Sequence, residues 1–376
     1  MTTALATTAA GARPRARGAR LVEFLMVGGL TPLLFPLSWA LREAFGLSEA
    51  EYWTGFTFFY AAHLINDPHF SVTYLLFYED GRARAFGGRF SRWQRARYLA
   101  AGIGVPLLVG GWAIGCLWTQ SAFGLGLMIQ LMFLLVGWHY VKQGFGVMVV
   151  LSARRGVRYS KRERLALLAH CYAGWAYAWA SPFDPGHEAV EKGVFYSTFA
   201  HPGWLEPLTL TVFAASTVWL VAELAAKTLR DGRLPPLAPL TGLLCAVWAW
   251  SVFSQVDPLV RYAVPALHGL QYLYFVWLLK GNEAREREGP PHFETSARTR
   301  LVILVASALA LGLFLFDLAP MGLDDYFAPG AGQTRDLALG ATPYFAALYC
   351  FVNIHHYAMD AVIWRRDNPQ TRYLRG

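Results

Sequence analysis

The sequence predicts an all-α protein, a polytopic transmembrane bundle of about ten helices with both termini in the cytoplasm. Its 376 residues are 55% hydrophobic and only 15% charged, and the mean hydropathy of +0.32 is too apolar for an ordinary soluble domain. Apolar stretches of about 20 residues, long enough to cross a bilayer core, recur along the chain. Successive loops alternate between basic and acidic, which is the pattern of the positive-inside rule.

The apolar runs define ten candidate spans, with boundary errors of a few residues. These spans are 21–41, 53–78, 98–118, 124–150, 163–182, 206–226, 237–254, 259–279, 300–317 and 342–364. Within the second span, Pro68 predicts a kink, because proline removes a helical hydrogen bond.

One transmembrane domain, residues 20–366, is expected between two tails. Residues 1–19, rich in Ala, Thr and Arg, are expected to be disordered, and residues 367–376 form a cytoplasmic tail. The basic N-terminus is similar to the start of a signal peptide. The apolar run that follows is long and lacks a small-residue cleavage site, so we expect an uncleaved first span.

The net charge of +8 is a topology signal and does not indicate a nucleic-acid partner, because the basic residues lie in short loops beside apolar runs. The basic loops are 82–97, 154–164, 227–233, 280–300 and 365–375, and the opposite loops at 49–51, 184–191 and 317–325 are acidic. This pattern predicts a multi-pass protein of the inner (plasma) membrane. The four cysteines all fall within apolar runs without a CxxC pair, so no disulfide framework is expected.

Histidines dominate the polar content of the spans. Seven of the ten lie within predicted spans: His63, His69, His139, His170, His268, His355 and His356. Ionisable residues inside a membrane are costly, so they are candidates for function. We interpret His170 as a helix–helix hydrogen-bonding residue, and His187, His201 and His292 as loop residues.

Four of these histidine-bearing spans also place a polar neighbour about one helical turn from a histidine, on the same helix face. Those neighbours are Asn66 and Asp67 after His63, Lys142 and Gln143 after His139, Gln271 after His268, Asn353 before His356 and Asp360 after it. Tyr140, Tyr272 and Tyr357 flank the polar positions and are interpreted as packing residues.

The helical rise places most of these histidines at one depth. Counted from the cytoplasmic ends of the spans, His69, His139, His268 and the His355/His356 pair lie roughly 15–18 Å deep, near the bilayer centre. His63 lies about 9 Å further outward. The kink at Pro68 would let it bend toward this layer; otherwise it belongs to a second, shallower site.

Imidazole binds zinc, copper, iron and haem iron, and metal-bound histidines usually donate their second N–H to a carboxylate, amide or carbonyl. We therefore expect a metal centre. The ligand candidates are His63, His69, His139, His268, His355 and His356, with Asp67 and Asp360 as ligands or orienting carboxylates and Gln143, Gln271 and Asn353 as supporting amides. Lys142 is a candidate base or a contact for an anionic head group.

The segments HLINDPHF, GWHYVKQ, HGLQY and NIHHYAMD resemble the histidine-rich integral-membrane non-haem iron enzymes, which include lipid desaturases, hydroxylases and bacterial carotene-cleaving dioxygenases. The HxxxH and HxxHH boxes of membrane desaturases are absent. The resemblance therefore implies a class of chemistry and carries over no residue roles.

The sequence thus favours a membrane oxidoreductase with one or two histidine-bound metal ions, iron before copper or zinc. Its substrate would be lipophilic and would enter from the bilayer lipids, and its electrons would come from an external donor. A haem-binding electron carrier and a transporter or proton-coupled channel with a His/Asp/Lys relay remain open.

Overall fold

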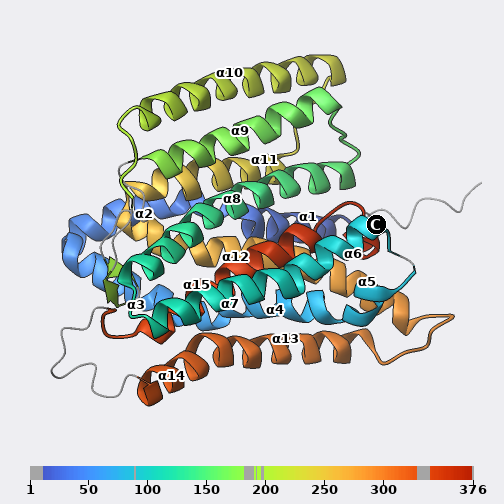
Figure 1. Cartoon of the computed structure of the whole chain (residues 1–376). Helices are drawn as coiled ribbons and strands as arrows, with labels where there is room; N and C mark the ends of the chain where they lie inside the picture. Colours follow the sequence, from blue (N-terminus) through green and yellow to red (C-terminus); the bar gives the residue numbers. More distant parts are fainter. Residues whose placement is uncertain are drawn as a thin grey trace, which may run out of the picture.

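The computed structural model describes residues 12–88, 90–181, 190–191, 193–195, 199–327 and 339–374. These residues form a helical bundle in which the long helices run side by side, roughly along one direction (Figure 1). The one sheet among them is a two-residue antiparallel pair, β1 (Val190–Glu191) and β2 (Val194–Phe195). The all-α class predicted from the sequence is confirmed.

Fifteen α-helices are described: α1 (Ala12–Phe24), α2 (Thr31–Phe45), α3 (Leu47–Leu64), α4 (Asn66–Tyr78), α5 (Gly81–Phe86), α6 (Arg92–Leu99), α7 (Val105–Trp118), α8 (Ala122–Arg154), α9 (Lys161–Ala180), α10 (Leu205–Asp231), α11 (Leu237–Leu244), α12 (Pro258–Glu288), α13 (Ala297–Leu313), α14 (Ala319–Phe327) and α15 (Pro343–Ile363). Wider π-helical turns extend several of them: η1 (Leu25–Gly29), η2 (Ala100–Gly104), η4 (Cys245–Val252) and η6 (Phe314–Leu318). Two 3₁₀ segments, η5 (Phe253–Gln255) and η7 (Pro369–Leu374), complete the set.

Four continuous helical stretches are long and apolar enough to cross a membrane: Arg92–Trp118, Ala122–Arg154, Leu205–Asp231 and Ala297–Phe327. A fifth candidate is the pair Gly18–Gly29 and Thr31–Phe45, bent by 59°. Between 17% and 39% of the residues in the four apolar windows are buried within the protein. Most of this apolar surface therefore faces outward, which is consistent with a membrane protein.

The predicted second span is broken rather than smoothly kinked. α3 ends at Leu64 and α4 begins at Asn66, with Ile65 out of helical geometry at φ −124° and ψ −58°. Pro68 then lies in the first turn of α4, where its missing N–H leaves no hydrogen bond unmade. The helix thus breaks three residues before the proline, and the polar residues around it lie at the break.

Helical segments lie within both predicted tails. α1 begins at Ala12, within the segment 1–19 for which disorder is expected from the sequence. Alanine and arginine are good helix formers, and the helix continues directly into the first apolar run. At the other end, η7 packs against α12, with Thr371 and Leu374 buried. Residues 1–11 and 375–376 lie outside the described part of the chain, as does His187.

The centre of the bundle is formed by α4, α8, α12 and α15, while α10 and α13 lie at opposite edges (Figure 1). Close backbone approach brings the central helices together. A Cβ added at Gly269 of α12 would lie 3.2 Å from the Ile65 side chain, so α12 crosses directly over the break between α3 and α4. This crossing sets His268 beside the first turn of α4.

Candidate metal centre

Four histidines from four helices meet in the middle of the bundle. His69 comes from α4, His139 from α8, His268 from α12 and His356 from α15, and none is more than 5% exposed. The ring centroids of His69 lie 4.9 Å from His268 and 4.6 Å from His356. Those of His139 lie 4.8 Å and 4.9 Å from the same two rings. We call these four side chains the histidine cluster.

The ring nitrogens of the cluster face one another. His139 Nε2 lies 3.1 Å from His268 Nε2 and 3.3 Å from His356 Nε2. Ligands of one metal ion are spaced about 2.9–3.4 Å apart when the metal–nitrogen bonds are about 2.0–2.1 Å long. One imidazole nitrogen carries either one proton or one lone pair, so His139 Nε2 cannot hydrogen-bond both neighbours properly. A cation bound by His139 Nε2 together with a neighbouring nitrogen would remove this conflict.

His69 is the fourth member of the cluster, and its ring nitrogens are available as metal ligands. One ring nitrogen from each of His69, His139 and His356 lies within 4.8 Å of the others. In the described part of the chain, neither ring nitrogen of His69 has a hydrogen-bond partner. A buried polar atom without a partner costs about 1–3 kcal/mol. The unpaired nitrogens of His69 therefore favour a ligand in the cluster.

Asp360 supplies a carboxylate to the same space. It lies one turn after His356 on α15, and its Oδ2 is 3.5 Å from His356 Nε2 and 3.6 Å from His139 Nε2. This oxygen is buried and accepts no hydrogen bond from the described residues. The other oxygen, Oδ1, accepts a 2.8 Å hydrogen bond from the Tyr272 hydroxyl. One oxygen is therefore held in place and the other is free for a cation.

A chain of hydroxyls fixes the Asp360 carboxylate. The Thr73 hydroxyl lies 2.6 Å from the Tyr272 hydroxyl, which itself donates to Asp360. Tyr272 was interpreted from the sequence as a packing residue, so its part in the site was missed. Its part in the site could have been predicted from its position four residues after His268 on α12, because that spacing places both side chains on one helix face.

The other predicted ligands lie outside the cluster. His355 points toward α4, where the Tyr74 hydroxyl is 3.1 Å from its Nδ1. His63 and Asp67 are bonded to each other, with 3.1 Å between Nδ1 and Oδ2. His170 lies between Ser216 and Trp248, with its Nε2 accepting from the Trp248 indole at 3.2 Å. Its contacts are those of an interhelical hydrogen-bonding residue.

The predicted amides bond mainly to backbone and to each other. Gln143 donates to the backbone carbonyl of His268 at 3.2 Å and to the Gln271 side chain at 2.9 Å. Gln271 donates to the backbone of Val27 at 2.6 Å, and Asn353 accepts from the Tyr357 hydroxyl at 2.9 Å. These bonds position α8, α12 and α15 around the histidines without contacting a ring nitrogen.

Lys142 belongs to a different face of α8. Its ammonium lies 5.9 Å from the centroid of the Phe145 ring and 6.0 Å from that of Tyr172 on α9. A cation over aromatic rings is stabilised there by the ring electrons. Three residues after His139, Lys142 thus faces α9 rather than the histidine cluster.

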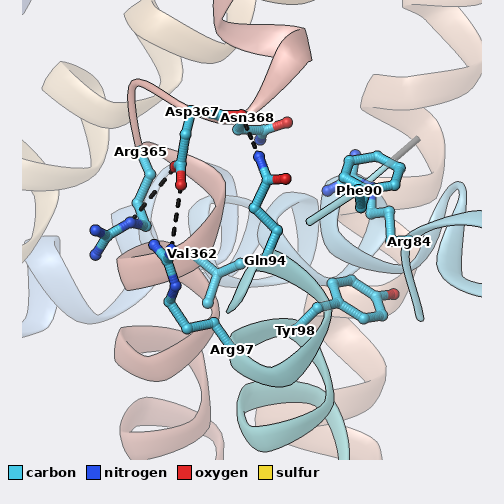
Figure 2. Close-up of a pocket in the computed structure, with 9 residues that line it drawn as sticks. All are labelled: Arg84, Phe90, Gln94, Arg97, Tyr98, Val362, Arg365, Asp367 and Asn368. Atoms are coloured by element: carbon cyan, nitrogen blue, oxygen red, sulfur yellow. Dashed lines mark hydrogen bonds and ion pairs between the residues drawn. The ribbon is translucent and has the colours of Figure 1, made fainter. Parts of the chain in front are cut away.

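The surroundings of the cluster are aromatic. His69 lies 4.6 Å from the Phe70 ring, His268 4.4 Å from Tyr140 and His139 4.9 Å from Tyr357, between centroids. A pocket elsewhere, at the end of the bundle where α15 finishes, is lined by charged and polar side chains together with Phe90, Tyr98 and Val362 (Figure 2). Figure 2 shows Asp367 between Arg97 and Arg365 there, and none of the clustered histidines.

No family model, no characterised protein and no solved structure matches this chain. The site therefore has to be interpreted from its own geometry.

Proposed function

We propose that this protein is a membrane-embedded metal oxidoreductase. The metal would be held by the four histidines of the cluster, with Asp360 as a carboxylate ligand or close support. The observation that carries the proposal is the packing of buried ring nitrogens around His139: its Nε2 lies 3.1 Å from His268 Nε2 and 3.3 Å from His356 Nε2, and one nitrogen each of His69, His139 and His356 lies within 4.8 Å of the others. Among the described residues, neither the ring nitrogens of His69 nor Asp360 Oδ2 has a hydrogen-bond partner.

The donor set favours iron. Imidazoles with a carboxylate are the ligands of non-haem iron oxygenases, whereas thiolate ligands select zinc, copper(I) or iron–sulfur clusters. The four cysteines are free and buried, and they pack in apolar clusters with aliphatic and aromatic side chains. Iron is therefore the first choice, ahead of copper and zinc. We expect a single ion, because the nearest ring nitrogens surround one atom, His139 Nε2.

The same spacing counts against haem. Two histidines that bind one haem iron on opposite faces stand about 4 Å apart, with the porphyrin between them. Here the Nε2 atoms of His139 and His268 are 3.1 Å apart, and the four rings pack against one another with centroids 4.6–4.9 Å apart. A porphyrin would have to displace this packing.

The reaction class follows from the surroundings. Iron bound by imidazole and carboxylate supplies oxygen activation, and a site closed by aromatic side chains excludes water from reactive species. In such a place a lipophilic molecule from the bilayer would be hydroxylated, desaturated or cleaved. Electrons that the reaction requires would come from an external donor.

We further propose about ten crossings of the inner (plasma) membrane with both termini in the cytoplasm. The C-terminus and the basic connections α8–α9 and α12–α13 lie at the same end of the bundle (Figure 1). That arrangement agrees with the charge alternation along the sequence. Reporter fusions at each loop measure this directly: a basic loop that reports from the outer side would refute the orientation.

Metal analysis of the detergent-purified protein tests the centre, with His139→Ala as the variant. His170→Ala is the matched control, because His170 is also buried, at 1% exposure against 5% for His139, and lies outside the cluster. The wild type and the control should each hold bound iron, and His139→Ala should lose the iron of the histidine cluster and so contain less. Equal metal content in all three proteins, or none in the wild type, would refute the centre.

Activity is tested in cells that express the same three proteins. Mass spectrometry of the extracted lipids should show species that gain oxygen or lose hydrogen in the wild type and His170→Ala, and not in His139→Ala. If the wild type holds iron but its cells have the same lipid profile as cells expressing His139→Ala, the oxidoreductase proposal is refuted and the metal centre still stands.

A further inference from the structure

A second group of metal-ligating side chains lies at the break between α3 and α4. His63 Nδ1 is 3.1 Å from Asp67 Oδ2 and 3.3 Å from Asp317 Oδ2, and one atom from each residue lies within 4.8 Å of the other two. The three residues come from α3, α4 and η6. Asp317 was interpreted from the sequence only as part of an acidic outer loop.

This group is separate from the histidine cluster. Asp67 and His69 are two residues apart on α4, and two residues turn a helix by about 200°, so they leave nearly opposite faces. The rings near His63 are those of Phe59 and Tyr60, and no ring of the histidine cluster is among its described contacts. α4 thus presents one polar face to each group.

Close packing of α13 against α4 brings Asp317 to the other two residues. A Cβ added at Gly312 would lie 3.0–3.2 Å from the backbone and Cβ of Asp67. Glycine therefore allows the two helices to touch at this level. The π-helical turn η6, which begins two residues after Gly312, then directs Asp317 back toward His63.

The charges of this group are not balanced by the protein. The Asp67 side chain is 6% exposed and that of Asp317 is 22% exposed. In the described residues, neither carboxylate forms an ion pair with a lysine or arginine. Asp317 Oδ2 is a buried atom that accepts no hydrogen bond from them. The His63 side chain is 32% exposed and is the one basic partner of both carboxylates. Two carboxylates outnumber one imidazole, and a divalent cation would supply the missing positive charge.

We propose that His63, Asp67 and Asp317 form a second metal site that binds a divalent cation, separate from the centre held by the histidine cluster. One imidazole and two carboxylates suit Mn²⁺, Fe²⁺ or Zn²⁺, which accept mixed nitrogen and oxygen ligands. Because the ligands come from three segments, the bound ion joins α3 and α4 across their break to the end of α13.

The test uses the full-length protein, stripped of metal by a chelator and titrated in detergent with Mn²⁺ or Zn²⁺ alone. Asp317→Asn removes a ligand of the second site, and His63→Gln removes another from a different helix. Asp325→Asn is the control, because Asp325 lies on the same stretch of chain, is exposed and has no place in the group. His139→Ala reports on the first centre.

The wild type and Asp325→Asn should bind one ion more than Asp317→Asn and His63→Gln. His139→Ala should keep the ion that these two variants lose. If Asp317→Asn and His63→Gln both bind as many ions as the wild type, the carboxyl groups are protonated or paired only with His63, and the second site does not exist. That result leaves the histidine cluster untouched, since only His139→Ala tests it.

Discussion

The hydroxyl of Tyr272 is the most informative single atom to remove from the proposed centre. Tyr272→Phe deletes one oxygen atom from a side chain that is 2% exposed, so the packing of α12 is kept. The deleted hydroxyl donates to Asp360 Oδ1 at 2.8 Å and lies 2.6 Å from the Thr73 hydroxyl. The substitution therefore frees the carboxylate that faces the histidine nitrogens without touching any histidine.

Tyr272→Phe should weaken metal binding and stability, because Asp360 and Thr73 each lose a hydrogen-bond partner. Loss of a hydrogen bond that orients a metal ligand typically weakens metal binding about 10- to 100-fold, or about 1.4–2.7 kcal/mol. Folding is also affected, because Thr73 and Asp360 are both buried and lose a partner, at about 1–3 kcal/mol. We expect metal affinity to fall within the first range and the unfolding temperature to fall as well.

Competition between the purified protein and a coloured chelator of known affinity measures the metal constant. Tyr74→Phe is the control, because it removes a hydroxyl that also contacts a histidine, 3.1 Å from His355 Nδ1, outside the cluster. Its metal affinity should equal that of the wild type. Equal affinity in Tyr272→Phe would show that Asp360 is neither a ligand nor its support, and the carboxylate would have to be dropped from the centre.

Two further predictions concern the bundle. A Cβ at Gly144 would lie 2.5 Å from the Ala246 Cβ, whereas one at Gly146 would meet nothing within 4 Å. Gly144→Ala should therefore destabilise the protein by about 1–3 kcal/mol, and Gly146→Ala should leave the unfolding temperature unchanged or higher. Ser160 caps α9 in a reciprocal capping box, so Ser160→Ala should cost about 1 kcal/mol and Ser160→Asp should restore most of it. Thermal unfolding in detergent measures both, and an undisturbed Gly144→Ala or Ser160→Ala would contradict the packing or the cap.

Much of the site could be predicted from local spacing and depth. His69, His139, His268 and His356 were predicted to share one layer, because each helical residue adds about 1.5 Å of depth, and these four do meet. Asp360 lies one turn after His356, and this spacing predicted that both side chains lie on the same face of α15. Depth along a helix and the face of a side chain relative to its neighbours depend only on that helix, so they could be predicted from the sequence.

The sequence could not predict which side of each helix faces the centre. His355 and His356 are adjacent, about 100° apart around α15, and only packing decided that His356 enters the cluster while His355 contacts Tyr74. Lys142 was likewise turned to α9 by the neighbours of α8. Rotation about the helix axis depends on contacts between distant segments, and no local pattern contains it.

One short segment around the break at Ile65 serves two groups. In a continuous helix, His63 and His69 would be about 240° apart and about 9 Å apart along the axis, so a single site could not use both. With the helix interrupted, Asp67 remains on the side of His63, at 3.1 Å, and His69 turns to the histidine cluster. Pro68 lies between them in the first turn of α4 and keeps the break at this place. The sequence NDPH thus carries polar side chains of both groups on opposite sides of α4.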